Sequence, residues 1–212
     1  MSIFSKLKNV LREWEWTVYK KRRRARLKVT DFSILSTNCI GGIIYHDLGL
    51  EFRTPTVNFS IPIRDLLKLV ERPQWYMDQP LVEIPVPNPS PKVLLGAMLG
   101  DLRVNFMHYN NFQEAAEKWE ERKRKINWDR IILVATDRAN CDYETIRRFD
   151  RLPWPNKIIF TRLPYPEFPS ACHIPGFEAQ EELGILTDFK PGFWKQRFLD
   201  DFDYVAFLNR NQ

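Results

Sequence analysis

Three side chains of this sequence have the chemistry of a nucleophile, a base and an orienting acid: Cys39, His108 and Asp137. Cys39 follows the mainly apolar run 32–35 and precedes apolar residues at helical spacing, so we expect it at a strand-to-helix turn. A thiol near a helix N-terminus has a lowered pKa and becomes a usable nucleophile. With His108 as its base and Asp137 orienting the imidazole, the sequence predicts a Cys/His site suited to acyl transfer.

Each of these residues also has a structural interpretation, which the sequence leaves open. Cys39 could be a small buried residue in a glycine-containing turn. His108 could be a core histidine bonded to the backbone. Asp137 could form a local ion pair with Arg138 that fixes a loop. Residue type and chain order do not decide between these interpretations.

Polar residues lie at the carboxyl ends of four of the predicted strands, at 38–39, 58–60, 108–109 and 137–138. If these strands are parallel, their carboxyl ends share one edge of a sheet, where ligands bind in open α/β folds. The amide of Asn38 and the backbone N–H groups just after it could donate to an oxyanion there. We therefore predict a substrate-binding set made of Asn38, Gly41, Gly42, Asn58, Asp101, Tyr109 and Arg138.

The sequence predicts no metal site and no nucleotide-binding loop. The three cysteines, at positions 39, 141 and 172, are widely spaced, and no histidine or acidic pair has the spacing of metal ligands. Neither G-x-G-x-x-G nor a P-loop occurs, which argues against dinucleotide reduction and ATP hydrolysis by those routes. A coenzyme A ester and a nucleotide sugar are the two candidate cofactors. Reduced cysteines indicate the cytoplasm.

The first 30 residues differ from the rest of the chain in charge. They contain ten lysines and arginines against two glutamates, whereas the remainder has 22 basic and 25 acidic side chains. A basic run at 20–28 follows a segment whose apolar residues recur at intervals of three and four. These apolar residues predict one helical stripe, made of Ile3, Leu7, Val10, Trp14 and Val18.

Three interpretations of this segment stay open. Residues 3–28 could form an amphipathic helix on an anionic membrane surface. They could instead form a packing helix followed by a solvated basic linker. A nucleic-acid arm is disfavoured because the rest of the chain has no motif of a nucleic-acid-binding fold. No run of about 18 apolar residues occurs, so no transmembrane helix is predicted.

Helical and extended patterns alternate along the chain, with strands expected near 32–36, 56–60, 101–107, 130–135 and 157–161. This alternation predicts an α/β fold class: a three-layer sandwich with a mostly parallel central sheet. The proline-rich segment 73–92 allows only an edge strand, near 81–86. We expect an amphipathic, polybasic N-terminal helix at 1–29 and a single α/β domain at 30–212.

Two sequence motifs are shared with a known family. They are N-C-x-G-G-x-x-Y-x-D-L-G-L at 38–50 and F-R-T-P-T-V-N at 52–58. Over about residues 30 to 210, the chain resembles the bacterial exopolysaccharide biosynthesis protein family (domain of unknown function 1919). Later segments fit the same pattern, at 100–109, 118–129, 136–138 and 149–153. The resemblance implies a pathway, the assembly of surface polysaccharide, without implying a reaction.

Two functions follow as expectations. The first is a cytoplasmic transferase, peripheral on the inner face of the membrane, that acts on a sugar or polysaccharide precursor, with acyl transfer favoured. The alternative is a non-catalytic accessory protein that docks on the polysaccharide machinery through its N-terminal helix. The reactivity of Cys39 separates the two, because only a catalytic thiol should react quickly near neutral pH.

Overall fold

The computed structural model describes residues 3–86 and 93–210. The contacts of the chain group it into two compact units. We call the first the sheet unit, which comprises residues 31–42 and 52–184, and the second the helix unit, which comprises residues 1–30, 43–51 and 185–212. The last residues of the chain therefore group with the N-terminal helix, whereas the sequence predicts one domain over 30–212.

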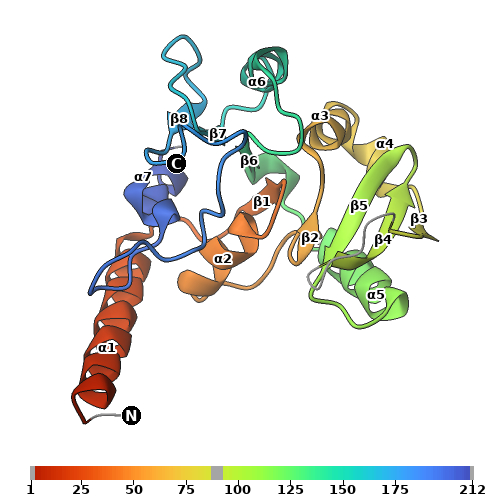
Figure 1. Cartoon of the computed structure of the whole chain (residues 1–212). Helices are drawn as coiled ribbons and strands as arrows, with labels where there is room; N and C mark the ends of the chain where they lie inside the picture. Colours follow the sequence, from red (N-terminus) through yellow and green to blue (C-terminus); the bar gives the residue numbers. More distant parts are fainter. Residues whose placement is uncertain (1–2, 87–92, 211–212) are drawn as a thin grey trace. The chain divides into compact units, whose positions relative to one another are not determined.

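Four strands of the sheet unit form a parallel sheet in the order β1-β6-β7-β8 (Figure 1). They are β1 (Ser33–Ser36), β6 (Ile131–Thr136), β7 (Lys157–Thr161) and β8 (Ala171–His173). Every residue of β1 and β6 is buried, as is usual in parallel sheets that are covered on both faces. The strands expected near 32–36, 130–135 and 157–161 are confirmed, and β8 is an addition to them.

Four other strands of this unit form an antiparallel sheet in the order β2-β5-β4-β3. Gly100 opens the two-residue turn between β4 and β5 with a φ of 62°, as a type II′ hairpin requires. The expectation that segments 56–60 and 101–107 belong to the parallel sheet is therefore wrong, while the expected edge strand is confirmed as β3. The strands are β2 (Phe59–Ser60), β3 (Leu81–Ile84), β4 (Val93–Leu99) and β5 (Leu102–Met107).

The segment before β2 turns where the sequence predicts extended chain. Asn58 has a φ of 64°, so pairing with β5 begins only at the next residue. The Thr56 hydroxyl instead bonds to the backbone at the edge of β1. It accepts a hydrogen bond from the Ser36 N–H at 3.2 Å and donates one to the Ile34 carbonyl at 3.3 Å. The predicted strand is shortened because this threonine bonds to β1 through its side chain.

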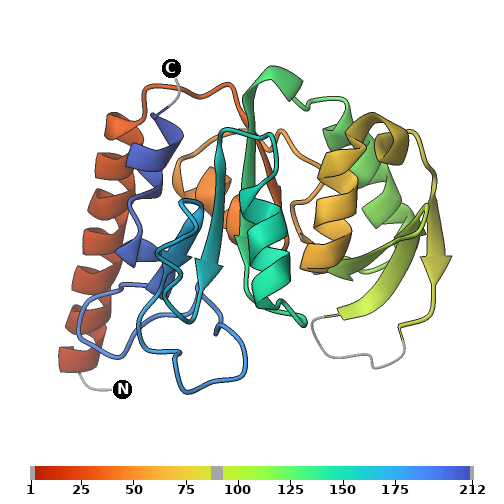
Figure 2. The ribbon, with the colours of Figure 1, turned by 90° about the horizontal axis from the view of Figure 1, so that it is seen from above.

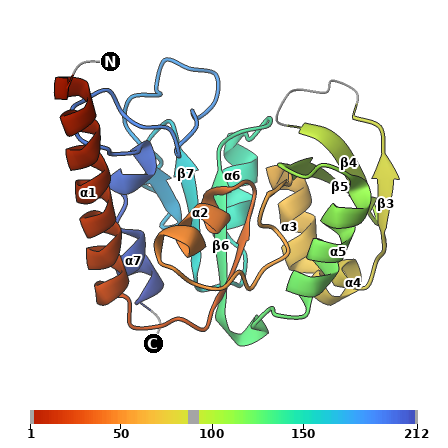
Figure 3. The same cartoon turned by 90° about the horizontal axis from the view of Figure 1, so that it is seen from below.

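Helices of the sheet unit pack around a large cluster of buried apolar residues. The helices α3 (Ile63–Glu71) and α6 (Tyr143–Asp150) lie side by side (Figure 1, Figure 2). Both α3 and α5 (Phe112–Lys123) lie against the antiparallel sheet (Figure 3). Trp119 of α5 is fully buried, with its ring centre 5.3 Å from that of Phe59. The predicted layered α/β class is confirmed.

Side-chain caps set the start of two of these helices. Asn111 accepts a hydrogen bond from the Glu114 N–H at 2.8 Å and so caps the start of α5. Asp142 accepts one from the Thr145 N–H, also at 2.8 Å, at the start of α6. Two short helices, α4 (Pro73–Met77) and η1 (Trp128–Arg130), complete the sheet unit.

The helix unit is built from α1 (Ile3–Arg26) and the C-terminal elements η2 (Phe198–Asp201) and α7 (Tyr204–Leu208). The guanidinium of Arg23 lies 4.1 Å from the ring centre of Tyr204, and the ring centres of Trp16 and Phe189 are 5.6 Å apart. One face of α1 is therefore a packing face. No helix in residues 3–86 or 93–210 has both the length and the apolar composition that crossing a membrane requires.

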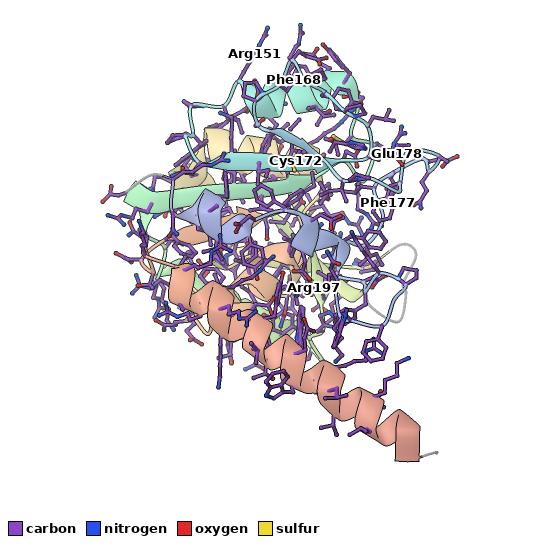
Figure 4. All side chains as sticks on the ribbon, turned by 90° about the vertical axis from the view of Figure 1, so that its left-hand side faces the viewer. Arg151, Phe168, Cys172, Phe177, Glu178 and Arg197 are labelled. Carbon is purple, nitrogen blue, oxygen red and sulfur yellow. The ribbon has the colours of Figure 1, made fainter. Side chains whose placement is uncertain are left out.

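Arg197 is a buried cation of the helix unit (Figure 4). Its guanidinium donates to the carboxylate of Asp47, at the end of α2 (Ile40–Asp47), and to Asp200 at 2.9 Å. It also lies 4.7 Å from the ring centre of Trp16 on α1. One buried charge thus connects α1, the end of α2 and the C-terminal segment.

Candidate functional site

A polar cavity of about 240 Å³ lies in the sheet unit where β1 and β6 end. Because these strands are parallel neighbours, their carboxyl ends lie at the same edge of the sheet. We call this cavity the strand-end pocket. Its polar lining consists of three hydroxyl groups, two amides and one ion pair, which come from Thr37, Ser60, Thr136, Asn38, Asn105, Arg138 and Glu182.

Asn38 braces the wall of the pocket. Its Oδ1 accepts a hydrogen bond from the Ile40 N–H at 3.1 Å, and its Nδ2 donates to Thr136 Oγ1 at 3.1 Å. The Thr37 and Thr136 hydroxyls are 3.5 Å apart. The turn after β1 is thereby joined to the end of β6. Asn38 lines the pocket, and its predicted roles in substrate binding and as an oxyanion donor stay predictions.

Asp137 ties the end of β6 to two other segments. Its Oδ2 accepts a hydrogen bond from the Arg162 N–H at 2.8 Å, and its Oδ1 accepts one from the Leu183 N–H at 3.1 Å. Burial raises the pKa of Asp137, and the two N–H groups offset part of that rise. Within residues 3–86 and 93–210, no hydrogen bond joins Asp137 to His108, so the geometry favours a loop-fixing role.

Glu182 clamps the loop that follows Asp137. Its Oε1 accepts a hydrogen bond from Arg138 Nη2 at 2.9 Å, and its Oε2 accepts one from the Ala139 N–H at 3.1 Å. Ala139 and Asn140 have φ values of 56° and 60°, a left-handed conformation that costs a non-glycine residue about 1 kcal/mol or more. Such strain is most often held where it serves a site.

Asn105 and Ser60 supply the wall from the antiparallel sheet. They are partners in the ladder between β5 and β2. The Oδ1 of Asn105 accepts a hydrogen bond from Arg103 Nε at 3.1 Å, which leaves its NH₂ group available as a donor. Ile63, the first residue of α3, also lines the pocket, so the positive end of that helix dipole lies at its margin.

Cys39 and His108 do not line the strand-end pocket. Cys39 is half-buried and directly precedes α2, as the predicted strand-to-helix turn requires. His108 is exposed at the end of β5, with a φ of 69°. Burial raises the pKa of Tyr109, and a negative charge on Cys39 adds to the rise. Cys39 is therefore near Tyr109, the residue that follows His108. The nucleophile–base pair of Cys39 and His108 stays a prediction.

The two predicted glycines of this turn allow close packing. A Cβ on Gly41 would lie 2.7 Å from Ser36 Oγ, and a Cβ on Gly42 would lie 3.2 Å from Val57 Cγ1. Gly41 therefore has to be small for the first turn of α2 to approach β1. Neither glycine lines the pocket, so their predicted substrate contacts stay predictions.

Three further predicted residues have structural roles. Asp101, at the β4–β5 turn, accepts hydrogen bonds from Lys68 at 2.9 Å and from Tyr76 at 2.8 Å. The hydroxyl of Tyr109 accepts one from Arg122 at 2.9 Å. Asp101 and Tyr109 lie beyond opposite ends of β5, roughly 20 Å apart at about 3.3 Å per residue. They cannot line one small pocket. Asn58 makes the left-handed turn before β2.

The remaining cysteines have raised pKa values. Burial, with the nearby carboxylates of Asp137 and Asp142, raises the pKa of Cys141 to about 12. Burial also raises the pKa of Cys172, which lies on β8 (Figure 4). Among the residues that the structure describes, no group of three histidine, cysteine or acidic side chains is placed to hold a metal ion. An Asp-x-Asp motif at 201–203 is held in ion pairs with Lys190 and Arg26.

Sequence reasoning misses most of the pocket. Of the predicted substrate-binding set, Asn38 and Arg138 line it. Asn105 has a weak signal, as a polar residue on the less buried side of an alternating strand. Glu182 has none, because it lies in an irregular segment 44 residues from its partner Arg138.

Comparisons with known proteins identify relatives without adding an activity. The family model of DUF1919, described as a domain of unknown function, matches residues 10–209. A protein of Haemophilus influenzae (strain ATCC 51907 / DSM 11121 / KW20 / Rd), described as an uncharacterized protein, is 34% identical over 209 residues. That alignment covers 99% of each chain. What the site can do must therefore be argued from its own geometry.

Proposed function

Because the chain belongs to the DUF1919 family, whose description states no activity, we propose a function from its pocket: it binds a sugar there and acts as a transferase in surface-polysaccharide assembly. The observation that carries the proposal is the lining of hydroxyl groups, amides and one arginine–glutamate pair around about 240 Å³. That volume lies below the roughly 300–1,000 Å³ of most small-molecule sites, which suits one sugar ring.

The lining matches the hydrogen-bonding needs of a sugar. Each sugar hydroxyl both donates and accepts, so a site for it needs donors and acceptors close together. The NH₂ group of Asn105 and the guanidinium of Arg138 are donors, and the carboxylate of Glu182 is an acceptor. The strained, clamped loop at Ala139 holds Arg138 in place before a ligand arrives, which lowers the entropic cost of binding.

For the transfer step, we propose Cys39 as the acyl carrier and a coenzyme A ester as the donor. The Cys39 thiolate attacks the acyl carbonyl and expels the coenzyme A thiolate, which leaves a thioester. A sugar hydroxyl then attacks this thioester, loses its proton to a carboxylate such as Glu182, and regenerates the thiolate. Cys39 is one residue after the pocket residue Asn38, and this adjacency supports the proposal.

Titration calorimetry with monosaccharides, nucleotide sugars and coenzyme A esters tests the binding step. We expect a sugar or nucleotide sugar to bind, and we expect Asn105→Ala and Glu182→Gln each to weaken its binding about tenfold or more, since each removes a hydrogen bond to a polar ligand. Gln113→Ala, on an exposed position of α5, is the matched control. A sugar that binds all four proteins equally would show that the strand-end pocket is not its site.

A non-catalytic role in the polysaccharide machinery is the alternative. It predicts sugar binding without turnover and an unreactive Cys39. Mass spectrometry of the protein after incubation with acetyl coenzyme A distinguishes the two functions. A mass gain of one acetyl group that disappears in Cys39→Ser supports the transferase, and its absence at saturating donor supports the accessory role.

A further inference from the structure

Over residues 7–26, the N-terminal helix α1 has one apolar face that is covered and an opposite apolar face that is exposed. The covered face carries Trp16, whose ring lies 5.6 Å from that of Phe189. It also carries Tyr19 and Arg23, with the Arg23 guanidinium 4.5 Å from the Tyr19 ring and 4.1 Å from the Tyr204 ring. These contacts lie within the helix unit, so they fix α1 to the C-terminal segment of the chain.

The opposite face of α1 presents an exposed apolar stripe. Its residues are spaced as i, i+3, i+4 and i+7, which places them on one side of the helix. Trp16 lies nine residues after the first of them, about half a turn away around the helix axis at 100° per residue. The stripe consists of Leu7, Val10, Leu11 and Trp14, which are 57%, 63%, 45% and 66% exposed.

Large side chains seldom stay this exposed in a row unless something covers them. A second group of exposed aromatic residues lies in the same unit: Phe193 is 45% and Trp194 54% exposed. The ammonium group of Lys8 lies 5.0 Å from the Phe193 ring centre, so this aromatic pair is next to the first half of α1. Tryptophan in particular is enriched where an apolar surface meets water at a membrane.

The positive charge at the end of α1 indicates an anionic partner. Seven of the nine residues at 20–28 are basic, and Lys21, Arg22 and Arg24 among them are exposed. Outside the first 30 residues, acidic side chains outnumber basic ones by 25 to 22. An anionic surface would therefore attract α1 and would not attract the rest of the chain. Nucleic acid has that charge as well, but phosphate contacts give no reason for an exposed apolar stripe.

We propose that α1 lies flat on a membrane that contains anionic lipid, with the stripe of Leu7, Val10, Leu11 and Trp14 entering the boundary between head groups and acyl chains. The basic run at 20–28 then contacts the lipid head groups. The covered face stays packed on the C-terminal segment of the helix unit, so α1 brings the whole chain to the membrane surface. The proposal does not depend on what the strand-end pocket binds.

Co-sedimentation of the full chain with vesicles tests this. One set of vesicles contains phosphatidylcholine and phosphatidylserine, and the other contains phosphatidylcholine alone. We expect binding to the first set, weakened about tenfold or more by the double variant Leu11→Gln/Trp14→Gln. The triple variant Lys21→Gln/Arg22→Gln/Arg24→Gln should weaken it on the order of 100-fold, because each charge near an anionic surface contributes about fivefold.

Val82→Gln is the control, because Val82 is an exposed apolar residue of the sheet unit. Glutamine is a good helix former, so the α1 variants should keep their helix content, which circular dichroism checks. Equal binding of wild type and both α1 variants, or no binding to anionic vesicles, would overturn the proposal. So would a dimer that Leu11→Gln/Trp14→Gln dissociates in sedimentation equilibrium, since the stripe would then cover a second copy.

Discussion

The Glu182 carboxylate accepts a hydrogen bond from the Arg138 guanidinium at 2.9 Å, across 44 residues of sequence. The same carboxylate accepts the N–H of Ala139. One distant segment thereby fixes the loop at the end of β6, and this loop forms part of the wall of the strand-end pocket. The conformation of Ala139 makes that arrangement testable.

Replacing Ala139 with glycine should stabilise the protein. The left-handed φ of 56° costs alanine about 1–2 kcal/mol, whereas glycine adopts it freely. The greater freedom of glycine in the unfolded chain offsets about 0.5–1 kcal/mol of this gain. We expect a net increase of about 0.5–1 kcal/mol in the free energy of unfolding, measured with urea. Ala115→Gly, inside α5, should instead lose about 1 kcal/mol, and a loss at both positions would show that Ala139 is unstrained.

The three cysteines should differ in reactivity. The pKa of Cys141 is raised to about 12 and that of Cys172 is raised too, so both are almost entirely protonated near pH 7.5. Cys39 precedes a helix, where thiolates are favoured. We expect iodoacetamide to label Cys39 first, as measured by peptide mass spectrometry, with equal labelling of all three in urea as the control. Labelling of Cys39 no faster than Cys141 would remove it as a nucleophile.

Asp203 should make the helix unit sensitive to acid. Burial raises its pKa, but the ion pair with Arg26 and the Ala206 N–H outweigh this and hold the pKa below its usual 3.8. A lowered folded pKa means that the stabilisation is complete above about pH 4 and is lost as the pH falls further.

The variant Asp203→Asn separates the charge from the helix cap, because asparagine also caps α7 through its side-chain oxygen. Both charged groups are about half-exposed, so we expect a loss of less than about 1 kcal/mol near neutral pH. The difference from wild type should vanish near pH 2, as followed by tryptophan fluorescence in urea. A difference that stays constant with pH would assign the effect to packing.

Arg197 should be the most sensitive position of the helix unit. Its removal in Arg197→Met leaves the buried carboxylate of Asp47 without this cation and leaves Asp200 with Arg23, at 3.7 Å; breaking such a buried pair typically costs about 3–5 kcal/mol. Adding Asp47→Asn should recover part of that loss, because the buried charge that lost this cation is gone. Thermal unfolding measures both variants. No recovery in the double variant would mean that the arginine acts mainly through its contact with Trp16.

The sequence predicts the strands of the parallel sheet well and the antiparallel sheet poorly. Long apolar runs identify β6 and β7, because strands buried on both faces have this composition. The strict alternation of β5 is typical of a strand with one covered face, which is the opposite case. This alternation indicates an antiparallel sheet, whereas the sequence-based expectation is one parallel sheet. β8 has only three residues, too few for a periodic signal.

The candidate site is predictable only where it follows a strand. Asn38 is the second residue after β1, and Arg138 is the second residue after β6. Because β1 and β6 are parallel neighbours, strand order alone brings these two residues near each other. Glu182 reaches the same place through tertiary folding of an irregular segment, which leaves no local pattern. His108 follows a strand of the other sheet, so the rule of shared carboxyl ends does not apply to it.

The Thr56 hydroxyl has a consequence for how the molecule behaves among its copies. β1 is one of the two edge strands of the parallel sheet, and its outward N–H and C=O groups could pair with a strand of another molecule. Thr56 already occupies the Ser36 N–H and the Ile34 carbonyl. One side chain thus blocks strand addition at this edge, which protects a largely apolar sheet from aggregation between copies.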